Sequence, residues 1–355
     1  MPLVVRFAGP GKVELAEEAA HPLAEGDVRV RTSYSGISAG TELTAYRGTN
    51  PYLLHRWEPD DRLFVPGAAT VSYPIDGWGY SEVGQVVEAA PDVVEPSVGD
   101  VVWGIWGHRE EAVIEADRLR GHVLPPGVPE VYGVFARVGA IALNATLASE
   151  ARLGEWVVVF GQGVFGLLAT RLAVLSGANV LAVDSIPARR EAAVALGARQ
   201  AALPSDDVAR RLRQLTDGRG ADVAVELSGS YRALHEAVRS VGVGGRVVAA
   251  GFYQGDGVGL RLGEEFHLNR VQIVASQIGG VPPAAAPRWT VERLQTTFMR
   301  LVADGRVDPG PLVTNTVAAA EVASAYDLLD RAPGDAMQVV IDFTKITNAH
   351  PGRCL

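Results

Sequence analysis

Three glycines between an apolar run and a helix-like stretch constrain the fold of this chain more than any other feature. The apolar run is Trp156 to Phe160, the glycines are Gly161, Gly163 and Gly166, and the helix-like stretch is Leu167 to Leu175. In such a motif the glycines provide a tight turn, close backbone approach to a pyrophosphate, and close packing of helix on strand. Free N–H groups at the start of the helix then face the phosphates. The predicted cofactor-binding residues of this motif are Gly161, Gln162, Gly163, Val164, Phe165 and Gly166.

A carboxylate follows the next predicted strand, Asn179 to Val183. Asp184 is placed where it would accept hydrogen bonds from a ribose 2′-hydroxyl and repel a 2′-phosphate, which predicts NAD in preference to NADP. Arg189 and Arg190 could hold a 2′-phosphate instead, or lie on a solvated helix face, and we include Arg189 in the predicted site. Ser228, after a further predicted strand, completes it. Alternatively, the glycines only make a turn and Asp184 caps the next helix.

Further apolar runs alternate with helix-like stretches after this motif. The predicted strands are Asn179 to Val183, Asp222 to Leu227, Arg246 to Ala250 and Val271 to Ser276. The predicted helices are Pro187 to Leu196, Val208 to Leu215 and Tyr231 to Val241. Continuous apolar strands alternating with helices predict an α/β fold with a doubly wound parallel sheet. We assign residues 139–287 to this dinucleotide-binding domain.

Residues 1–138 have a different pattern, in which short β-like runs are separated by Gly and Pro. These runs are Leu3 to Phe7, Val28 to Thr32, Glu82 to Glu88, Asp100 to Trp103 and Glu111 to Glu115. They predict an irregular β-rich domain. Pro-rich sequence before residue 288 marks a second boundary, after which a helix near Val291 to Ala303 and a strand at Met337 to Phe343 are predicted. Residues 288–355 are therefore assigned to the β-rich domain, with a disordered tail after Lys345.

Composition excludes several classes of protein. The formal net charge of -9 offers no basic field for nucleic acid or anionic lipid. The single cysteine, Cys354, excludes an internal disulfide and a cysteine-based zinc site. No uninterrupted apolar segment reaches about 18 residues, so no membrane span is expected. The first residues lack the pattern of a secretory signal, and we expect a cytoplasmic protein.

Several stretches resemble the medium-chain dehydrogenase/reductase superfamily, which includes the alcohol and polyol dehydrogenases. They are Tyr34 to Glu42, Gly79 to Glu88, Val98 to Val102, the glycine motif with Asp184, and Pro311 to Asn315. The resemblance covers essentially the whole chain and implies a Rossmann domain joined to a GroES-like catalytic domain. It also implies an NAD(P)-dependent oxidoreductase that acts on a small molecule. Members usually pair as homodimers through the edge of the nucleotide domain, and the apolar run Val271 to Ser276 could serve that purpose.

The chain departs from this superfamily at the catalytic metal. In the zinc-dependent branch a Cys, a His and a later Cys or Glu bind the metal, and the matching positions here are Ser38, Tyr80 and, with a less certain alignment, Arg137. The Glu beside the His becomes Ser81, and the four-cysteine lobe is absent. Zinc needs thiolate, imidazole or carboxylate ligands. The resemblance therefore implies a zinc-free member.

Four residues are candidates for the acid and base groups that would replace the metal. Tyr80 could exchange a proton with a substrate oxygen, or pack with its hydroxyl hydrogen-bonded. His108 titrates near neutral pH and could be a general base, or a solvated loop residue. Glu42 could act as base or orient another group, or cap a helix. Ser38 could hydrogen-bond substrate or nicotinamide, or satisfy a turn.

Three further residues are predicted to bind substrate. The resemblance places Trp106 on the pocket wall. Arg137 could stabilise an alkoxide, grip a carboxylate or phosphate, or form a structural salt bridge. Trp57 belongs to an aromatic stretch, Tyr46 to Trp78, that could cover a polar ring-shaped substrate or form a satellite cluster under a loop.

Together these features predict a zinc-free oxidoreductase that moves a hydride between NAD(H) and a secondary alcohol or ketone. Resemblance to polyol and threonine dehydrogenases in the C-terminal half favours a sugar, cyclitol or similar metabolite. One alternative is a quinone or enoyl reductase acting on C=C bonds, although members of that branch usually favour NADPH and lack an acid at the Asp184 position. Another is a non-catalytic dinucleotide-binding protein.

Overall fold

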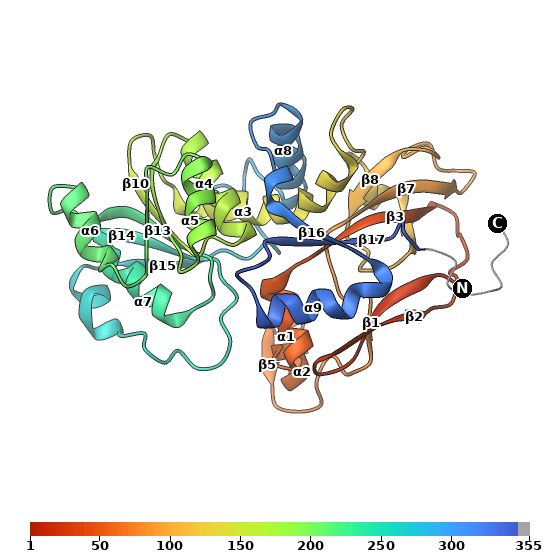
Figure 1. Ribbon diagram of the computed structural model, residues 1–355, viewed down its shortest axis with the longest axis horizontal. Coiled ribbons are helices and arrows are strands. Elements are labelled where there is room, and N and C mark those ends of the chain that lie inside the picture. The colour runs from red at the N-terminus through yellow and green to blue at the C-terminus, as the bar shows by residue number, and fades with distance from the viewer. Residues whose placement is uncertain (347–355) are drawn as a thin grey trace. The chain divides into compact units, whose positions relative to one another are not determined.

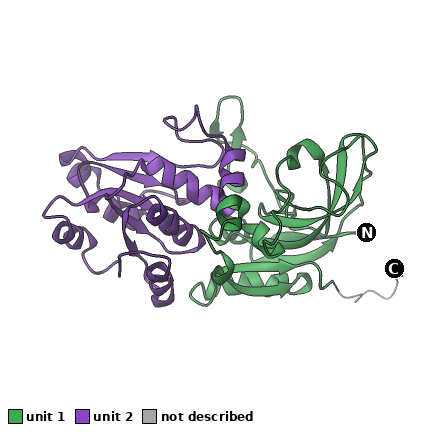
Figure 2. Cartoon of the chain, turned by 90° about the horizontal axis from the view of Figure 1, so that it is seen from above, with its two compact units in different colours: residues 1–137, 299–355 green, residues 138–298 purple. Residues whose placement is uncertain are grey.

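The computed structural model describes residues 1–346, which form two compact units. Unit 1 contains residues 1–137 together with those from 299 onward, and unit 2 contains residues 138–298 (Figure 2). The second change of unit therefore falls at residue 299, inside helix α8 (Val291–Ala303), rather than at 288. The predicted disordered tail, with Cys354, lies outside the described residues apart from Ile346.

Unit 2 is built on a six-stranded parallel sheet with the strand order β12-β11-β10-β13-β14-β15 (Figure 1). The strands are β10 (Trp156–Phe160), β11 (Asn179–Val183), β12 (Gln200–Ala202), β13 (Ala221–Glu226), β14 (Val241–Ala249) and β15 (Gln272–Ala275). The helices between them are α4 (Val164–Leu175), α5 (Pro187–Ala195), α6 (Val208–Leu215) and α7 (Tyr231–Ser240). This order confirms the predicted doubly wound fold. The winding reverses between β10 and β13, where ligands bind in such sheets.

Helix α3 (Phe135–Ser149), which leads toward the sheet, was not predicted from the sequence. Most of its residues are apolar on every side, so it lacks the stripe by which an amphipathic helix is recognised. The helical stretch Glu130–Ser149 is long and apolar enough to cross a membrane by length and composition, contrary to the sequence-based expectation. However, 67% of the apolar window is buried inside the protein, as in the core helix of a soluble protein.

Unit 1 is organised around β3 (Asp27–Ile37), a strand of 11 residues. Its sheet has the order β16-β17-β3-β7-β8, with β9 also paired to β3. The other members are β7 (Glu82–Ala89), β8 (Val101–Gly104), β9 (Glu111–Glu115), β16 (Val313–Ala318) and β17 (Gln338–Asp342). A smaller sheet contains β1 (Leu3–Gly9), β2 (Lys12–Glu17) and β6 (Ile75–Asp76), and a hairpin joins β4 (Arg56–Glu58) to β5 (Leu63–Val65). This β-rich architecture is consistent with the predicted GroES-like domain.

Helix α9 (Val322–Arg331) supplies much of the core of unit 1 and, like β16, was missed by the sequence analysis. Tyr326 on α9 makes an edge contact with Phe7 at 5.1 Å and stacks on Tyr46 at 5.8 Å between ring centroids. Tyr46 belongs to α1 (Ala39–Arg47), which is followed by α2 (Pro51–Leu54). The buried residues of α9 repeat at helical spacing, a signal that the sequence does contain.

Candidate active site

Ser38 and Tyr80 meet in unit 1 at the position predicted for the catalytic group. Strand β3 ends at Ile37 and α1 begins at Ala39, so Ser38 lies at the junction, and its Oγ hydrogen-bonds the Tyr80 hydroxyl. Ser38 is buried and Tyr80 is half-buried. Burial raises the pKa of Tyr80, and hydrogen bonds with Ser38 and Thr41 oppose that rise only in part. The phenol therefore keeps its proton at neutral pH.

Arg137 lies close to this pair, in the first turn of α3. Its guanidinium is half-buried, burial lowers its pKa, and Tyr80 is the neighbour that opposes this change. Among the described residues, no carboxylate lies within the 4.0 Å of an ion pair. The structural salt bridge that the sequence left open is therefore not formed in the described part of the chain.

The side chains at this position do not fit a zinc ion. Ser38, Tyr80 and Arg137 offer a hydroxyl, a phenol and a cation, whereas protein zinc sites use thiolate, imidazole or carboxylate. Glu42, the carboxylate that interacts with Tyr80, is fully buried and already binds three groups described below. No step of the chemistry is therefore derived through a metal here.

Glu42 and His108 lie in the interior of unit 1 and not on the wall of a pocket. Both are 0% exposed, and His108 Nε2 is 2.8 Å from Glu42 Oε2. His108 Nδ1 is 2.5 Å from Ser35 Oγ, so both ring nitrogens have partners. Glu42 Oε1 accepts the backbone N–H of Ser38 at 2.8 Å. The alternative of a solvated loop histidine is wrong because the ring is fully enclosed.

Glu82 and Tyr326 complete this buried network, and sequence reasoning assigned a role to neither. Glu82 Oε1 lies 3.9 Å from His108 Nδ1, and the Tyr326 hydroxyl donates to Glu42 Oε2 at 2.5 Å. Burial raises the pKa of Glu82. Burial alone would lower the pKa of His108, but the charges of Glu42 and Glu82 outweigh it and raise that pKa. One imidazolium is thus held between two acids.

The described hydrogen bonds join the network to the Ser38 and Tyr80 pair through backbone N–H groups, including that of Ser81, which donates to Glu82 Oε1 at 3.0 Å. The Ser38 N–H donates to Glu42, while the Ser38 hydroxyl contacts Tyr80. A backbone amide does not relay a proton to the hydroxyl of its own side chain. The described hydrogen bonds therefore give Glu42 and His108 no side-chain proton path to Tyr80.

In unit 1, Trp106 packs in an apolar core cluster and Trp57 packs against other aromatic rings. Trp106 is 9% exposed, belongs to an apolar core cluster, and its indole N–H donates to Thr32 Oγ1 at 2.9 Å. The expected place of Trp106 on a pocket wall is therefore not what the structure shows. Trp57 lies on the β4–β5 hairpin, with its ring 4.9 Å from that of Phe64 and 6.4 Å from that of Tyr52. This arrangement matches the satellite aromatic cluster that the sequence left open.

The three glycines of unit 2 have the distinct environments that the motif predicts. Gly161 has φ of +83°, and a Cβ there would lie 2.8 Å from the backbone nitrogen of Ser228. A Cβ at Gly166 would lie 1.7 Å from the carbonyl oxygen of Gly161, so only glycine allows this packing of α4 against the turn. A Cβ at Gly163 would meet nothing within 4 Å, and no side chain caps α4. The open space at Gly163, beside the start of α4, fits a pyrophosphate.

Gln162 is fully buried, so its side chain does not face this open space. Its amide donates to the Val159 carbonyl at 2.9 Å and accepts from Thr170 Oγ1 at 3.0 Å. Only the backbone of Gln162 could serve a cofactor. Val164 and Phe165, by contrast, are half-buried in the first turn of α4.

Asp184, at the end of β11, holds the glycine turn in place. Its Oδ2 accepts the Gln162 N–H at 2.7 Å and its Oδ1 accepts the Ile186 N–H at 2.8 Å. Asp184 is 7% exposed, and each oxygen retains a lone pair for a ribose hydroxyl. Arg190 is not on a solvated face, because it donates to the carbonyls of Asp184 at 2.8 Å and Ser185 at 2.9 Å. Arg189 lies half-buried on α5.

A second carboxylate, Glu226, lies at the carboxyl end of β13 beside the predicted Ser228. It is fully buried and accepts the N–H groups of Ser228 at 2.8 Å and Gly229 at 3.1 Å. The hydroxyls of Ser228 and Tyr253 also donate to it. Burial raises the pKa of Glu226. An acid that ends an apolar strand next to the sheet reversal was a signal available in the sequence.

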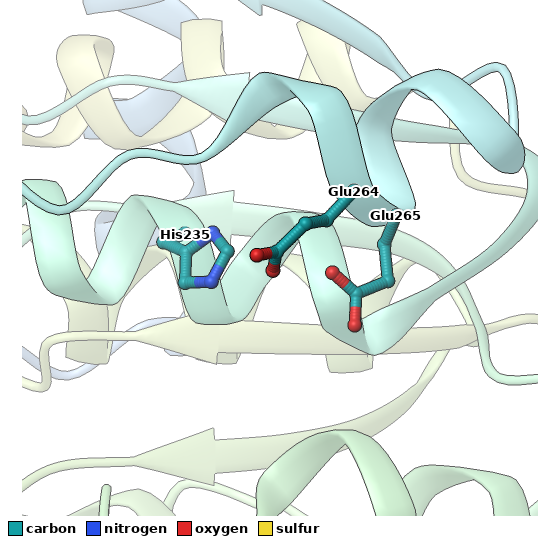
Figure 3. Close-up of side chains that lie close together, drawn as sticks. All are labelled: His235, Glu264 and Glu265. Carbon is teal, nitrogen blue, oxygen red and sulfur yellow. The ribbon is translucent and has the colours of Figure 1, made fainter.

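His235, Glu264 and Glu265 form the one group of potential metal ligands found among residues 1–346 (Figure 3). The three side chains point toward one another, from α7 and from the helical turn Leu262–Phe266. Arg261 occupies this group, lying 3.1 Å from His235 Nε2 and 3.3 Å from Glu264 Oε1, and Arg239 Nε lies 3.3 Å from Glu265 Oε1. The cluster is thus an ion-pair network, and its arginines oppose binding of a metal cation.

Comparisons with known proteins agree with this architecture. Residues 164–296 match the model of the zinc-binding dehydrogenase family. The chain is 28% identical over 342 residues to a D-guloside 3-dehydrogenase of Shigella flexneri, covering 94% of this chain and 98% of that protein. It is 25% identical to a 2-dehydro-3-deoxy-L-galactonate 5-dehydrogenase of Pseudoalteromonas atlantica, with 92% and 95% covered. The fold is also similar to that of an Escherichia coli L-idonate 5-dehydrogenase, with a TM-score of 0.78, 17% identity and coverage of 96% and 98%.

The family model and the curated relatives concern the same class of enzyme, and the relatives extend over nearly the whole chain. The two units have the corresponding architecture, with the Rossmann strand order in unit 2. The chain is therefore similar to these dehydrogenases over nearly its whole length, and residues 164–296 match the zinc-binding dehydrogenase family model.

Proposed function

We propose that this protein is a zinc-independent dehydrogenase that moves a hydride between NAD(H) and a secondary alcohol or ketone of a polyhydroxylated metabolite. The contact between the Ser38 and Tyr80 hydroxyls carries the proposal. The sequence resemblance matches these two residues to metal ligands of the zinc-dependent branch. Two relatives are named as dehydrogenases of sugar derivatives, which supports a substrate of that class. Glu42 and His108, proposed from sequence as catalytic, are assigned to positioning.

Tyr80 holds the proton that this chemistry needs. In ketone reduction its hydroxyl donates a proton to the oxygen that becomes the alcohol, and solvent then reprotonates the phenolate. Alcohol oxidation is the reverse: Tyr80 first loses its proton to solvent, and its oxygen then takes the proton of the alcohol. Ser38, Thr41 and the charge of Arg137 stabilise the phenolate that forms in between. Positioned acid–base groups of this kind contribute about 10²- to 10⁴-fold in rate. Bound NAD(H) supplies or accepts the hydride.

The backbone of the 161–166 turn and Asp184 would hold the cofactor in unit 2. The open space at Gly163 would receive the pyrophosphate, and Asp184 the adenosine ribose. We propose NAD over NADP because a carboxylate stands there and Arg190 already donates to two carbonyls. A homodimer through β15, an edge strand of the sheet, and a cytoplasmic location remain predictions.

The test is cofactor-linked turnover of polyols and cyclitols, followed by absorbance at 340 nm with NAD or NADP. We expect NADH formation, a preference for NAD, and loss of about 10²- to 10⁴-fold in kcat in Tyr80→Phe. Tyr132→Phe is the matched control, since it removes a hydroxyl that donates to Asp308 elsewhere in unit 1. Turnover of C=C substrates alone, with NADPH, would instead support a reductase, and tight NADH binding without turnover a non-catalytic role.

A further inference from the structure

Arg137 carries a charge that no described carboxylate neutralises. Some other half-buried arginines pair with carboxylates: Arg109 lies 3.2 Å from Glu18, and Arg246 lies 2.7 Å from Glu150. Arg213 instead donates to two backbone carbonyls, at 3.0 Å each. The guanidinium of Arg137 has no such partner among the described residues. A half-buried, unpaired charge is unfavourable unless something else compensates for it.

Arg137 lies within a continuous helical stretch, Glu130–Ser149, in which the turn Glu130–Val134 runs directly into α3. Burial lowers the pKa of its guanidinium, and Tyr80 is the neighbour that opposes this change. Among the described residues, no anion offsets the burial of this charge.

The groups around Arg137 are donors. Tyr80 lies beside Arg137, and its hydroxyl and that of Ser38 are directed at each other. One hydroxyl donates to the other, so the accepting hydroxyl keeps its hydrogen for a third group. The nearby acid, Glu42, has both oxygens committed to Ser38, His108 and Tyr326 in the interior. A guanidinium beside two hydroxyls complements an oxyanion, as arginine does at carboxylate and phosphate sites.

We propose that the substrate carries a permanent oxyanion, a carboxylate or a phosphate, which Arg137 binds. This inference rests on the proposed function and narrows its substrate class to sugar acids or sugar phosphates. A competing role for Arg137 is stabilisation of the alkoxide formed from any substrate. The two roles differ in effect: oxyanion binding acts on KM for anionic substrates alone, whereas alkoxide stabilisation acts on kcat for all substrates.

The experiment compares substrates that differ only in the anionic group. Aldonates, the polyols of the same stereochemistry and the polyol phosphates are each assayed with NAD, and their binding to the protein with NADH is measured by calorimetry. Wild type, Arg137→Gln, Arg137→Lys and the control Arg300→Gln are compared. Arg300 is exposed on α8, so its replacement removes the same charge away from the site.

We expect the aldonate or the phosphate to bind roughly 10- to 100-fold more tightly than the neutral polyol. Arg137→Gln should abolish that difference, and Arg137→Lys should restore part of it. The preferred anion distinguishes carboxylate from phosphate.

Equal binding of anionic and neutral forms by the wild type, or an anion preference that Arg137→Gln retains, would overturn the proposal. Calorimetry decides this point even if no compound is oxidised. Absence of turnover despite selective anion binding would count against the dehydrogenase function alone. Conversely, oxidation of neutral polyols without anion selectivity would leave the dehydrogenase function standing and remove the oxyanion site.

Discussion

Two polar clusters of unit 1 meet at Ser38 and differ in how fully their groups are satisfied. The interior cluster of Glu42, Glu82 and His108 is 0% exposed, and its ionisable groups are partnered with one another. The cluster of Tyr80 and Arg137 is half-buried, with a charge that no described residue balances. The comparison teaches that ionisable residues alone do not locate a reaction site. Polar groups that keep an unused hydrogen-bonding atom or an unbalanced charge are a better guide to the position of the site.

The first way to test this comparison is to remove one phenol hydroxyl from each cluster. Tyr80→Phe should lower kcat by about 10²- to 10⁴-fold and leave the free energy of unfolding nearly unchanged. Tyr326→Phe should do the opposite, costing about 1–3 kcal/mol of stability because buried Glu42 loses a donor, with kcat within a few-fold. Steady-state kinetics and urea unfolding of both variants check this. Similar kinetic losses in both would erase the distinction between the clusters.

Removal of Glu42 should destabilise unit 1 strongly. Glu42→Ala leaves the His108 imidazole without its 2.8 Å partner in a fully buried site, and breaking a buried pair costs about 3–5 kcal/mol. Glu18→Ala, which breaks the 3.2 Å pair with half-buried Arg109, is the comparison and should cost less. Chemical denaturation followed by tryptophan fluorescence measures both. A loss below about 1 kcal/mol in Glu42→Ala would contradict the assigned role.

Two buried histidines should give opposite pH dependences of stability. The pKa of His108 is raised in the folded protein. Its contribution to the free energy of unfolding is therefore complete below pH 6.5, its pKa in the unfolded chain, and is lost as pH rises through the folded pKa. Burial lowers the pKa of His122 from 6.5 to about 4, so its contribution is present above 6.5 and is lost as pH falls toward 4. The His122 effect amounts to about 3 kcal/mol.

Urea unfolding between pH 4 and 9 separates these contributions. His122→Phe, which can keep the stacking on Trp103 seen at 3.8 Å, should reduce the loss of stability between pH 6.5 and 4. His108→Gln should instead lose most stability relative to wild type below pH 6.5, where His108 contributes fully, and less at alkaline pH. The same sign of pH dependence in both variants would show that His108 is not held as a cation.

The smallest predicted effect is a change in NADH affinity when the open space at Gly163 in unit 2 is filled. Gly163→Ala should raise the Kd for NADH about tenfold, roughly 1.4 kcal/mol, because the new methyl would enter the space assigned to the pyrophosphate. Stability should not fall, since that methyl touches nothing within 4 Å. Gly9→Ala, also in open space but in unit 1, is the control. Fluorescence titration with NADH measures the difference, and equal affinities in the two variants would contradict the site.

Sequence reasoning succeeded where the signal is local. The strand, glycine turn and helix around Gly161 to Gly166 lie within 20 residues, and buried parallel strands are continuous apolar runs, so the sheet of unit 2 was predictable. The hydroxyl pair was also anticipated, because Ser38 and Tyr80 were matched to positions of a known family and then found in contact.

The interior network was not predictable in this way. Glu42 and Tyr326 are 284 residues apart, and Glu42 and His108 are 66 apart, so nothing local in the sequence pairs them. Glu82 begins an ordinary strand and gives no sign that its carboxylate faces inward. His108 and Glu42 looked catalytic because their chemistry is versatile. Burial, which a sequence does not display, assigns them to the scaffold.

Measurement of metal content alongside activity tests the central claim most directly. Protein purified without added zinc is dialysed against a chelator, its zinc per chain is determined by mass spectrometry, and NAD-linked oxidation of the best polyol or aldonate is assayed before and after zinc is restored. The account predicts that the chelated protein contains less than about 0.1 zinc per chain and retains full activity, because Ser38, Tyr80 and Arg137 are unsuited to hold zinc. Activity that falls with the zinc content and returns with added zinc would contradict it.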